Sequence, residues 1–291
     1  MKILPKANAL TAGIGLLLAG LLPAQGGTFD PQVGFGANDA IFFSSDQIQG
    51  WGTGVAELNR GPTDISNPSS GPVGFGTIDD VLGPSDAFGN ALNVLSLGDG
   101  GWITMTFDQP ITNGLGADFA VFENGFLVSG ELAFLEFAFV EVSSDGANFF
   151  RFDSISEIQT TNQTIGDGPA LLQVSDASEV NNLAGKYIAG YGTPFDLEEL
   201  VGIDPLLDVN AVTHVRIVDV VGSIDPAFGS LDSLDTIIND PFTTDFNTGG
   251  FDLDAVGVIH FVPEPASGSL LLGGGLALLA LRRRRTGTAK E

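Results

Sequence analysis

Short stretches in which apolar and polar residues alternate recur through the middle of the chain. The clearest spans residues 102–107, where Ile103, Met105 and Phe107 occupy every second position. Because successive side chains of a strand point to opposite faces, this period of two predicts a half-buried strand. A Gly-Asp-Gly-Gly turn precedes it, and the Asp-Gln-Pro sequence at 108–110 sets its expected end.

Similar runs predict five further strands. They are expected at residues 117–122, 135–143, 148–152, 212–221 and 251–261. Within 135–143 the apolar phase changes, which indicates a bulge or burial of both faces. The Asp145-Gly146 pair that follows predicts a tight hairpin with a two-residue turn.

Glycine and proline interrupt the chain so often that long helices are not expected. There are 40 glycines and 15 prolines, which favours many short strands joined by turns. Short helical turns are expected at 177–183 and 195–201, and long loops at 59–86 and 222–250. The pattern predicts an all-β exported domain over residues 26–261, folded as a β-sandwich of the jelly-roll type.

Both ends of the chain differ from this middle part. Lys2 and Lys6 precede an apolar stretch at 7–22, which has the build of a secretory signal peptide over residues 1–25, exported by the Sec machinery. At the other end, an apolar run at 266–281 lies between two short motifs. These motifs are Pro263-Glu264-Pro265 before the run and Arg282, Arg283, Arg284 and Arg285 after it.

These three C-terminal parts, in this order over residues 262–291, resemble the PEP-CTERM sorting signal of Gram-negative bacteria. The resemblance implies an exosortase as partner, which cuts near the motif after transient anchoring in the inner membrane and releases the protein to the cell surface or extracellular matrix. Four arginines after the run fit the positive-inside rule. The alternative is an ordinary membrane anchor, although 16 apolar residues are fewer than the about 20 that usually span a bilayer.

Charge limits the partners of the exported domain. Between Asp30 and Asp254 there are 34 acidic residues, and the only basic ones are Arg60, Arg151, Lys186 and Arg216. Such a surface repels phosphate, so we expect no binding to nucleic acid. Acidity on this scale fits bound calcium and equally fits a trait of solubility or habitat. The chain has no cysteine, which excludes thiol chemistry and disulfides.

Several segments between residues 97 and 261 show a second resemblance. They are GGWITMTF at 100–107, DFAVFEN at 118–124, VEVSSDG at 140–146, VRIVD at 215–219 and GFDLDAV at 250–256. Together they resemble uncharacterised bacterial cell-surface proteins with a discoidin-like or galactose-binding-like jelly roll. That fold serves carbohydrate, lipid and protein binding, so the resemblance implies the fold and leaves the function open.

Acidic residues on the last predicted strand are the candidates for a metal site. Asp252 and Asp254 lie two apart, so both carboxylates are expected on one side of the strand. Calcium takes six to eight oxygen ligands, and Asp118 and Glu123 are the further candidates, in the segment that the second resemblance pairs with this strand. Alternatively, Asp252 and Asp254 are solvated charges on an edge strand that discourage edge pairing.

Candidate sites for sugar or for catalysis are fewer. The aromatic residues that could stack on a glycan are Trp51, Trp102, Tyr187 and Tyr191, and Trp102 and Tyr191 are the ones assigned to ligand binding. Packing in the core or at its rim is the alternative for all four. His214 and His260 both lie in strand patterns without a nucleophile motif, so we do not expect an enzyme.

We therefore expect an exported cell-envelope or matrix protein, structural or adhesive and associated with exopolysaccharide. A calcium-dependent carbohydrate-binding module is the alternative, and an extracellular hydrolase is the minor one.

Overall fold

The computed structural model describes residues 27–163 and 173–263, and the regular structure in these ranges is almost entirely antiparallel β. One sheet has its strands in the order β1-β14-β6-β16-β2, with β4 beside the start of β16. The strands of this six-stranded sheet are β1 (Ile41–Phe42), β2 (Gly50–Trp51), β4 (Leu95–Ser96), β6 (Phe119–Glu123), β14 (Tyr191–Phe195) and β16 (Asp252–Val258). This confirms the all-β prediction.

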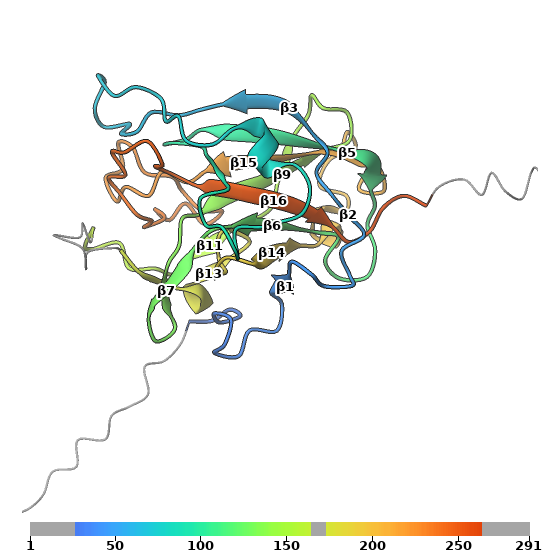
Figure 1. The fold of residues 1–291 in the computed structure, drawn as a ribbon, viewed down its shortest axis with the longest axis horizontal. Helices are drawn as coiled ribbons and strands as arrows, with labels where there is room; N and C mark the ends of the chain where they lie inside the picture. Colours follow the sequence, from blue (N-terminus) through green and yellow to red (C-terminus); the bar gives the residue numbers. More distant parts are fainter. Residues whose placement is uncertain (1–26, 164–172, 264–291) are drawn as a thin grey trace, which may run out of the picture.

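A five-stranded sheet has the order β10-β9-β15-β5-β3. Its strands are β3 (Gly54–Asn59), β5 (Trp102–Ile111), β9 (Ala138–Ser143), β10 (Phe150–Arg151) and β15 (Val212–Asp219). In the view of Figure 1 this sheet lies above the six-stranded one. Both sheets contribute to one core cluster, in which Ile103 and Ile217 of the upper sheet and Phe119 of the lower one are fully buried.

Smaller elements close the ends of the two sheets. They are the pair β11 (Ile155–Ser156) and β13 (Val180–Asn181), the small sheet of β7 (Phe126–Ser129), β8 (Leu132–Phe134) and β12 (Ser175–Asp176), and the 3-10 helices η1 (Ile78–Val81), η2 (Ala177–Glu179) and η3 (Leu197–Leu200). A second core cluster, which includes Leu135, Phe137 and Val180, packs beneath them. The two helical turns expected near 177 and 195 are therefore present as η2 and η3.

The outer face of the six-stranded sheet is covered by the chain that precedes and follows β1. Ala120, Phe122 and Ala255 point to this face and pack against Trp51 and other apolar residues of the segment before β3. A groove lies between this cover and β14.

Three details of the sequence prediction are wrong. The strand expected to end at Asp108 continues to Ile111, since Ile111 is fully buried and pairs with Val212 of β15. The strand expected at 135–143 begins at Ala138, and five of its six residues are buried, which confirms burial of both faces. The connection from β9, which ends at Ser143, to β10, which begins at Phe150, is longer than the predicted two-residue turn. In this connection the Asp145 side chain accepts hydrogen bonds from the backbone of Ala147 and Asn148.

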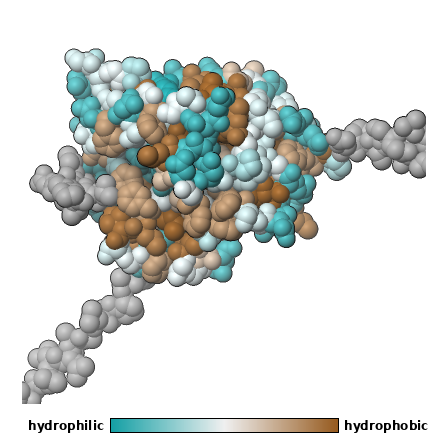
Figure 2. Space-filling model, in the orientation of Figure 1, coloured by the Kyte–Doolittle hydropathy of each residue, from teal (hydrophilic) through white to brown (hydrophobic). Residues whose placement is uncertain are grey.

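Strand β7 stands at the edge of the small sheet with all four residues exposed. Three of them are apolar, namely Phe126, Leu127 and Val128. Figure 2 shows apolar surface in this part of the molecule, at the lower left. Substitution of such an exposed side chain is expected to change the stability of the fold little.

Candidate functional site

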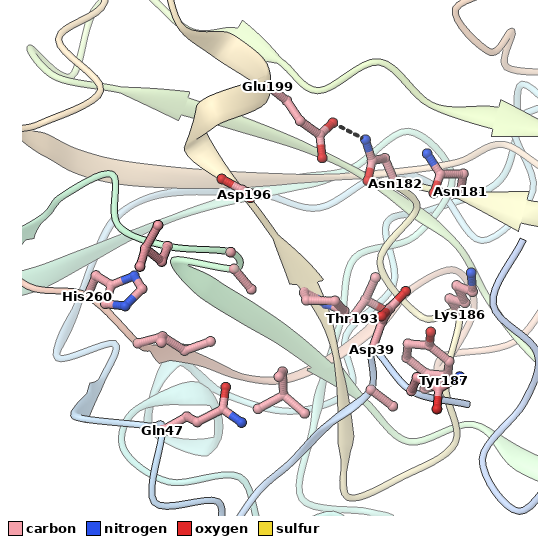
Figure 3. Close-up of a pocket in the computed structure, with 18 of the residues that line it drawn as sticks. Asp39, Gln47, Asn181, Asn182, Lys186, Tyr187, Thr193, Asp196, Glu199 and His260 are labelled. Atoms are coloured by element: carbon pink, nitrogen blue, oxygen red, sulfur yellow. Dashed lines mark hydrogen bonds between the residues drawn. The ribbon is translucent and has the colours of Figure 1, made fainter. Parts of the chain in front are cut away.

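A groove of about 620 Å³ runs along the outer side of β14 (Figure 3). Its walls come from the segment around β1, the turn at 115–117, the stretch from β13 to Tyr187, the start of η3 and the end of β16. Most of the lining is polar, with Asn38, Asp39, Asp46, Gln47, Gln49, Asn181, Asn182, Lys186, Thr193, Asp196, Glu199 and His260 as its hydrogen-bonding side chains. Ile41, Leu115 and Ile259 supply apolar surface between them. Side chains of this kind bind small polar ligands that also have an apolar face.

The upper wall of the groove is fixed by Asn182. This residue has a left-handed backbone (φ 51°), which asparagine tolerates better than most residues. Its amide donates to Glu199 Oε2 at 2.5 Å and to the carbonyl of Asp153 at 3.0 Å. Burial raises the pKa of Glu199, and the Asn182 hydrogen bond opposes that shift. The wall is therefore built from hydrogen bonds between residues far apart in the sequence.

The right-hand end of the groove in Figure 3 holds the single buried lysine of the described residues. Lys186 Nζ lies 5.5 Å from the centre of the Tyr187 ring, and the Tyr187 hydroxyl donates to Asp30 at 2.6 Å. Burial lowers the pKa of Lys186 to about 8, although Asp30 and Asp39 act against this. At neutral pH this end therefore offers a charged donor beside carboxylates.

Thr193 adds a polar atom without a partner. It lies in the middle of β14 and lines the groove. Its side chain is 3% exposed, and within the described part of the chain its Oγ1 has no hydrogen-bond partner. A buried hydroxyl without a partner is unfavourable, so a ligand or water that reaches it gains a hydrogen bond.

His260 lies at the left-hand end of the groove in Figure 3 and pairs with Asp118, which does not line the groove. Asp118 is fully buried, and its carboxylate accepts from the backbone of Gly114 and Leu197, both at 2.7 Å. His260 Nδ1 lies 2.8 Å from Asp118 Oδ1. Because the carboxylate accepts, the imidazole Nδ1 carries the proton and Nε2 remains an acceptor. Burial raises the pKa of Asp118, and the His260 hydrogen bond opposes this shift.

The predicted metal ligands are not brought together as one group. Strands β6 and β16 do pair, with Glu123 opposite Leu253 and Phe119 opposite Val258. Their antiparallel register leaves Glu123 beside the start of β16 and puts Asp118 at the far end of it. Asp118 is therefore buried behind His260, away from Asp252 and Asp254, and only His260 of this pair lines the groove.

Asp252 and Asp254 are buried, so the alternative of solvated edge charges is wrong. Strand β16 pairs with β6 on one side and with β2 and β4 on the other, which makes it central. Asp252 accepts from the Ser96 hydroxyl and the Asn124 amide, while Asp254 accepts from the Ser85 hydroxyl and the backbone of Asp86. Burial raises the pKa of each carboxyl to about 6.

Of the four aromatic candidates, Tyr187 lines the groove, whereas Trp51, Trp102 and Tyr191 do not. Trp102 begins β5 in the five-stranded sheet, is half-buried, and has an indole nitrogen with no partner among the described residues. Tyr191 begins β14 and contacts Phe42, with ring centres 4.9 Å apart. Phe43 and the exposed Phe88 complete this aromatic group.

Two features are absent from residues 27–163 and 173–263, namely a metal-holding group of side chains and a membrane-spanning helix. No group of three or more histidine, aspartate and glutamate side chains there is arranged to hold a metal ion. No helix in those ranges has the length and apolar character needed to cross a membrane. The signal peptide predicted over residues 1–25 and the C-terminal segment from Glu264 to Glu291, which contains the apolar run at 266–281, lie outside the described residues. Pro263 of the predicted sorting motif is exposed.

The chain matches no family model, and no curated protein is similar enough to count as a match. The ligand of the groove is therefore inferred from the side chains that line it. It offers amide, carboxylate, ammonium and imidazole groups around a partly apolar floor, which suits recognition of a hydroxyl-rich ligand.

Proposed function

We propose that this is an exported, adhesive protein of the cell envelope or extracellular matrix of a Gram-negative bacterium, and that it binds exopolysaccharide in the groove along β14. The observation that carries the proposal is the lining of the groove, in which amides and carboxylates alternate with small apolar patches. Sugars present hydroxyls that both donate and accept, and amides match them in both roles. The proposed fold is a jelly-roll sandwich whose outer face carries the site.

Charge restricts which polysaccharide fits. Asp39, Asp46, Asp196 and Glu199 line the groove, against one lysine and one histidine. The whole exported domain is also strongly acidic. Anionic glycans would be repelled by this field, so the proposed ligand is neutral or carries amino groups.

We expect a Gln47→Ala, Asn181→Ala double variant to bind glycan about 30-fold more weakly, because each of the two lost hydrogen bonds contributes about 1 kcal/mol. Both side chains line the groove, and neither makes a hydrogen bond within the described residues, so the fold should not suffer. The measurement is calorimetric titration with dextran, chitosan oligosaccharides and alginate. Asn90→Ala, an exposed amide outside the groove, is the matched control.

The proposal fails if neither dextran nor chitosan shows saturable binding, or if alginate binds best. It also fails if the double variant binds the glycan as tightly as Asn90→Ala does. Stronger binding of chitosan than of dextran assigns the acidic side chains a direct part in recognition.

Export and sorting form the second part of the proposal. Sec would export the chain through residues 1–25, and an exosortase would remove the C-terminal signal. We expect the mature protein to lack residues 266–291, because the arginines hold this segment at the inner membrane. Mass spectrometry of the protein recovered from the cell surface checks this. Recovery of peptides that contain Arg282 to Arg285 from the surface would show an uncut anchor instead.

An extracellular hydrolase is the second candidate, and the Asp118–His260 pair favours it. A buried carboxylate that orients an imidazole beside a groove is the arrangement of a general base. The test is release of reducing ends from the glycans that bind. Turnover that disappears in His260→Ala would establish the hydrolase, and binding without turnover would remove it.

A further inference from the structure

A second groove of about 610 Å³ adjoins the groove along β14, which we now call the first groove. Gln49 and His260 line both grooves, so the two meet at these side chains. Gln49 is exposed, and 28% of the His260 side chain is exposed, so a bound chain can cross from one groove to the other over them. Lys186 lies at the right-hand end of the first groove in Figure 3 and His260 at the left-hand end, so the second groove lengthens the site beyond His260.

The second groove lies where the chain after β16 meets the end of β5. The backbone nitrogen of Thr112 donates to the carbonyl of His260 at 3.0 Å, and that of Val262 donates to the carbonyl of Pro110 at 2.9 Å. Thr112 and Val262 both line the second groove. Its walls are therefore held by backbone hydrogen bonds between two segments that lie far apart in the sequence.

The imidazole of His260 is held from two sides at the junction of the grooves. Its Nδ1 lies 2.8 Å from Asp118 Oδ1, and a Cβ at Gly114 would lie only 2.2 Å from the same nitrogen. Because Gly114 has no side chain, the ring packs directly on the backbone there. Since Nδ1 is turned to Asp118, Nε2 is the ring nitrogen that can accept from a ligand hydroxyl.

The second groove differs from the first in its chemistry. Among the described residues that line it, none is acidic, whereas four carboxylates line the first groove. It offers the Thr112 hydroxyl and the Gln49 amide for hydrogen bonds, and the Phe261 ring as apolar surface. Phe261 is partly buried against the core, and its ring covers Gly50, where a Cβ would lie 2.7 Å from Cε2. A fixed ring beside hydroxyl and amide groups suits a neutral sugar unit.

We propose that the two grooves together bind a stretch of several sugar units in one linear polysaccharide chain, which runs from Lys186 past His260 to Phe261. This inference rests on the proposed function and narrows its ligand to a polymer rather than a single sugar. Each groove lies within the about 300 to 1,000 Å³ usual for one small ligand, and the two together exceed that range. Because carboxylates line only the first groove, amino groups of the ligand are recognised there, and the second groove adds affinity for neutral units.

The test is calorimetric titration of the purified full chain with trisaccharides and decasaccharides prepared from dextran and from chitosan. Wild type should bind the decasaccharides about 30-fold more tightly, because two further hydrogen bonds in the second groove contribute about 1 kcal/mol each. Thr112→Val with Phe261→Leu should reduce this gain to the several-fold that repeated binding frames give, and should bind the trisaccharides as wild type does. Thr236→Val with Phe126→Leu is the matched control, because both residues are exposed and line neither groove.

Equal affinity of wild type for both lengths would overturn the proposal and leave the second groove to another occupant, such as the residues that follow Pro263. A gain that the Thr112 and Phe261 variant keeps in full would overturn it too, because the further contacts would then lie elsewhere. If that variant does not fold, nuclear magnetic resonance of wild type decides. Decasaccharides should shift the amide signals of Thr112 and Phe261, and unchanged signals contradict the proposal. If neither length binds, the proposed function itself fails, whereas binding without a gain from length removes this inference alone.

Discussion

In the presence of a chelator, the protein should be most stable near about pH 4 and lose stability steadily towards pH 7. Burial raises the pKa of Asp252 and of Asp254 from 3.8 to about 6. A raised carboxyl pKa means that the folded state holds its proton longer, so its contribution is complete below about pH 3.8 and lost through pH 6. For Asp254 alone this loss is about 3 kcal/mol.

The fully buried carboxyls extend this trend to higher pH. Burial raises the pKa of Glu123, Glu136, Asp219 and Asp240 well above the ordinary values. Thermal melting over this pH range, repeated in about 0.5 M sodium chloride to screen surface repulsion, measures the effect. A melting temperature that stays level or rises between about pH 5 and pH 7 in chelator contradicts this account.

Phe119→Ala should destabilise the protein by about 4 kcal/mol and lower its melting temperature by about 10 °C. Phe119 is fully buried in the core shared by both sheets. Its ring stacks on that of Phe195 at 5.4 Å and contacts that of Phe152 at 6.0 Å. Removing the ring leaves a cavity between the sheets that the surrounding strands cannot fill.

Phe126→Ala is the matched control for this prediction. The Phe126 side chain is 46% exposed on the edge strand β7. Its loss should cost less than about 1 kcal/mol, because little apolar surface returns to water. Similar losses in the two variants, measured by chemical denaturation, would show that the two sheets do not share a core around Phe119.

The longer strands could be predicted from the sequence because their alternation runs over several residues. Ile103 and Met105 are both fully buried as the period of two requires. Strands of two residues, such as β1 and β4, carry no period at all. They form because the neighbouring strand offers backbone partners, which a local pattern does not contain.

The groove could not be predicted for a related reason. The residues that line the groove come from five separate segments of the chain. Two of them, Asn182 and His260, are 78 residues apart in the sequence. The sequence predicts Asp118 as a metal ligand and His260 as a strand histidine, because only the antiparallel register of β6 and β16 brings the two together as a pair. The signal available in the sequence was a polar residue at each end of two apolar strands.

The burial of the acidic side chains could not be predicted from the sequence pattern. Alternation alone cannot tell a solvated carboxylate from a buried one. The partners of Asp252 and Asp254 are Ser96 and Ser85, which lie 156 and 169 positions away. Glu136 falls inside the strand predicted at 135–143 but lies outside β9, and Asp240 lies in a long loop, so alternation does not indicate that either is buried.

The claim that the groove holds the exported protein in the polysaccharide matrix has one direct test. Cultures that export wild type, Gln47→Ala with Asn181→Ala, or Asn90→Ala are separated into medium, matrix and cell fractions, and the protein in each is quantified. We expect wild type and Asn90→Ala in the matrix fraction, released by soluble dextran or chitosan fragments, and most of the double variant in the medium. The same matrix fraction for all three proteins, unaffected by soluble fragments, would contradict the account.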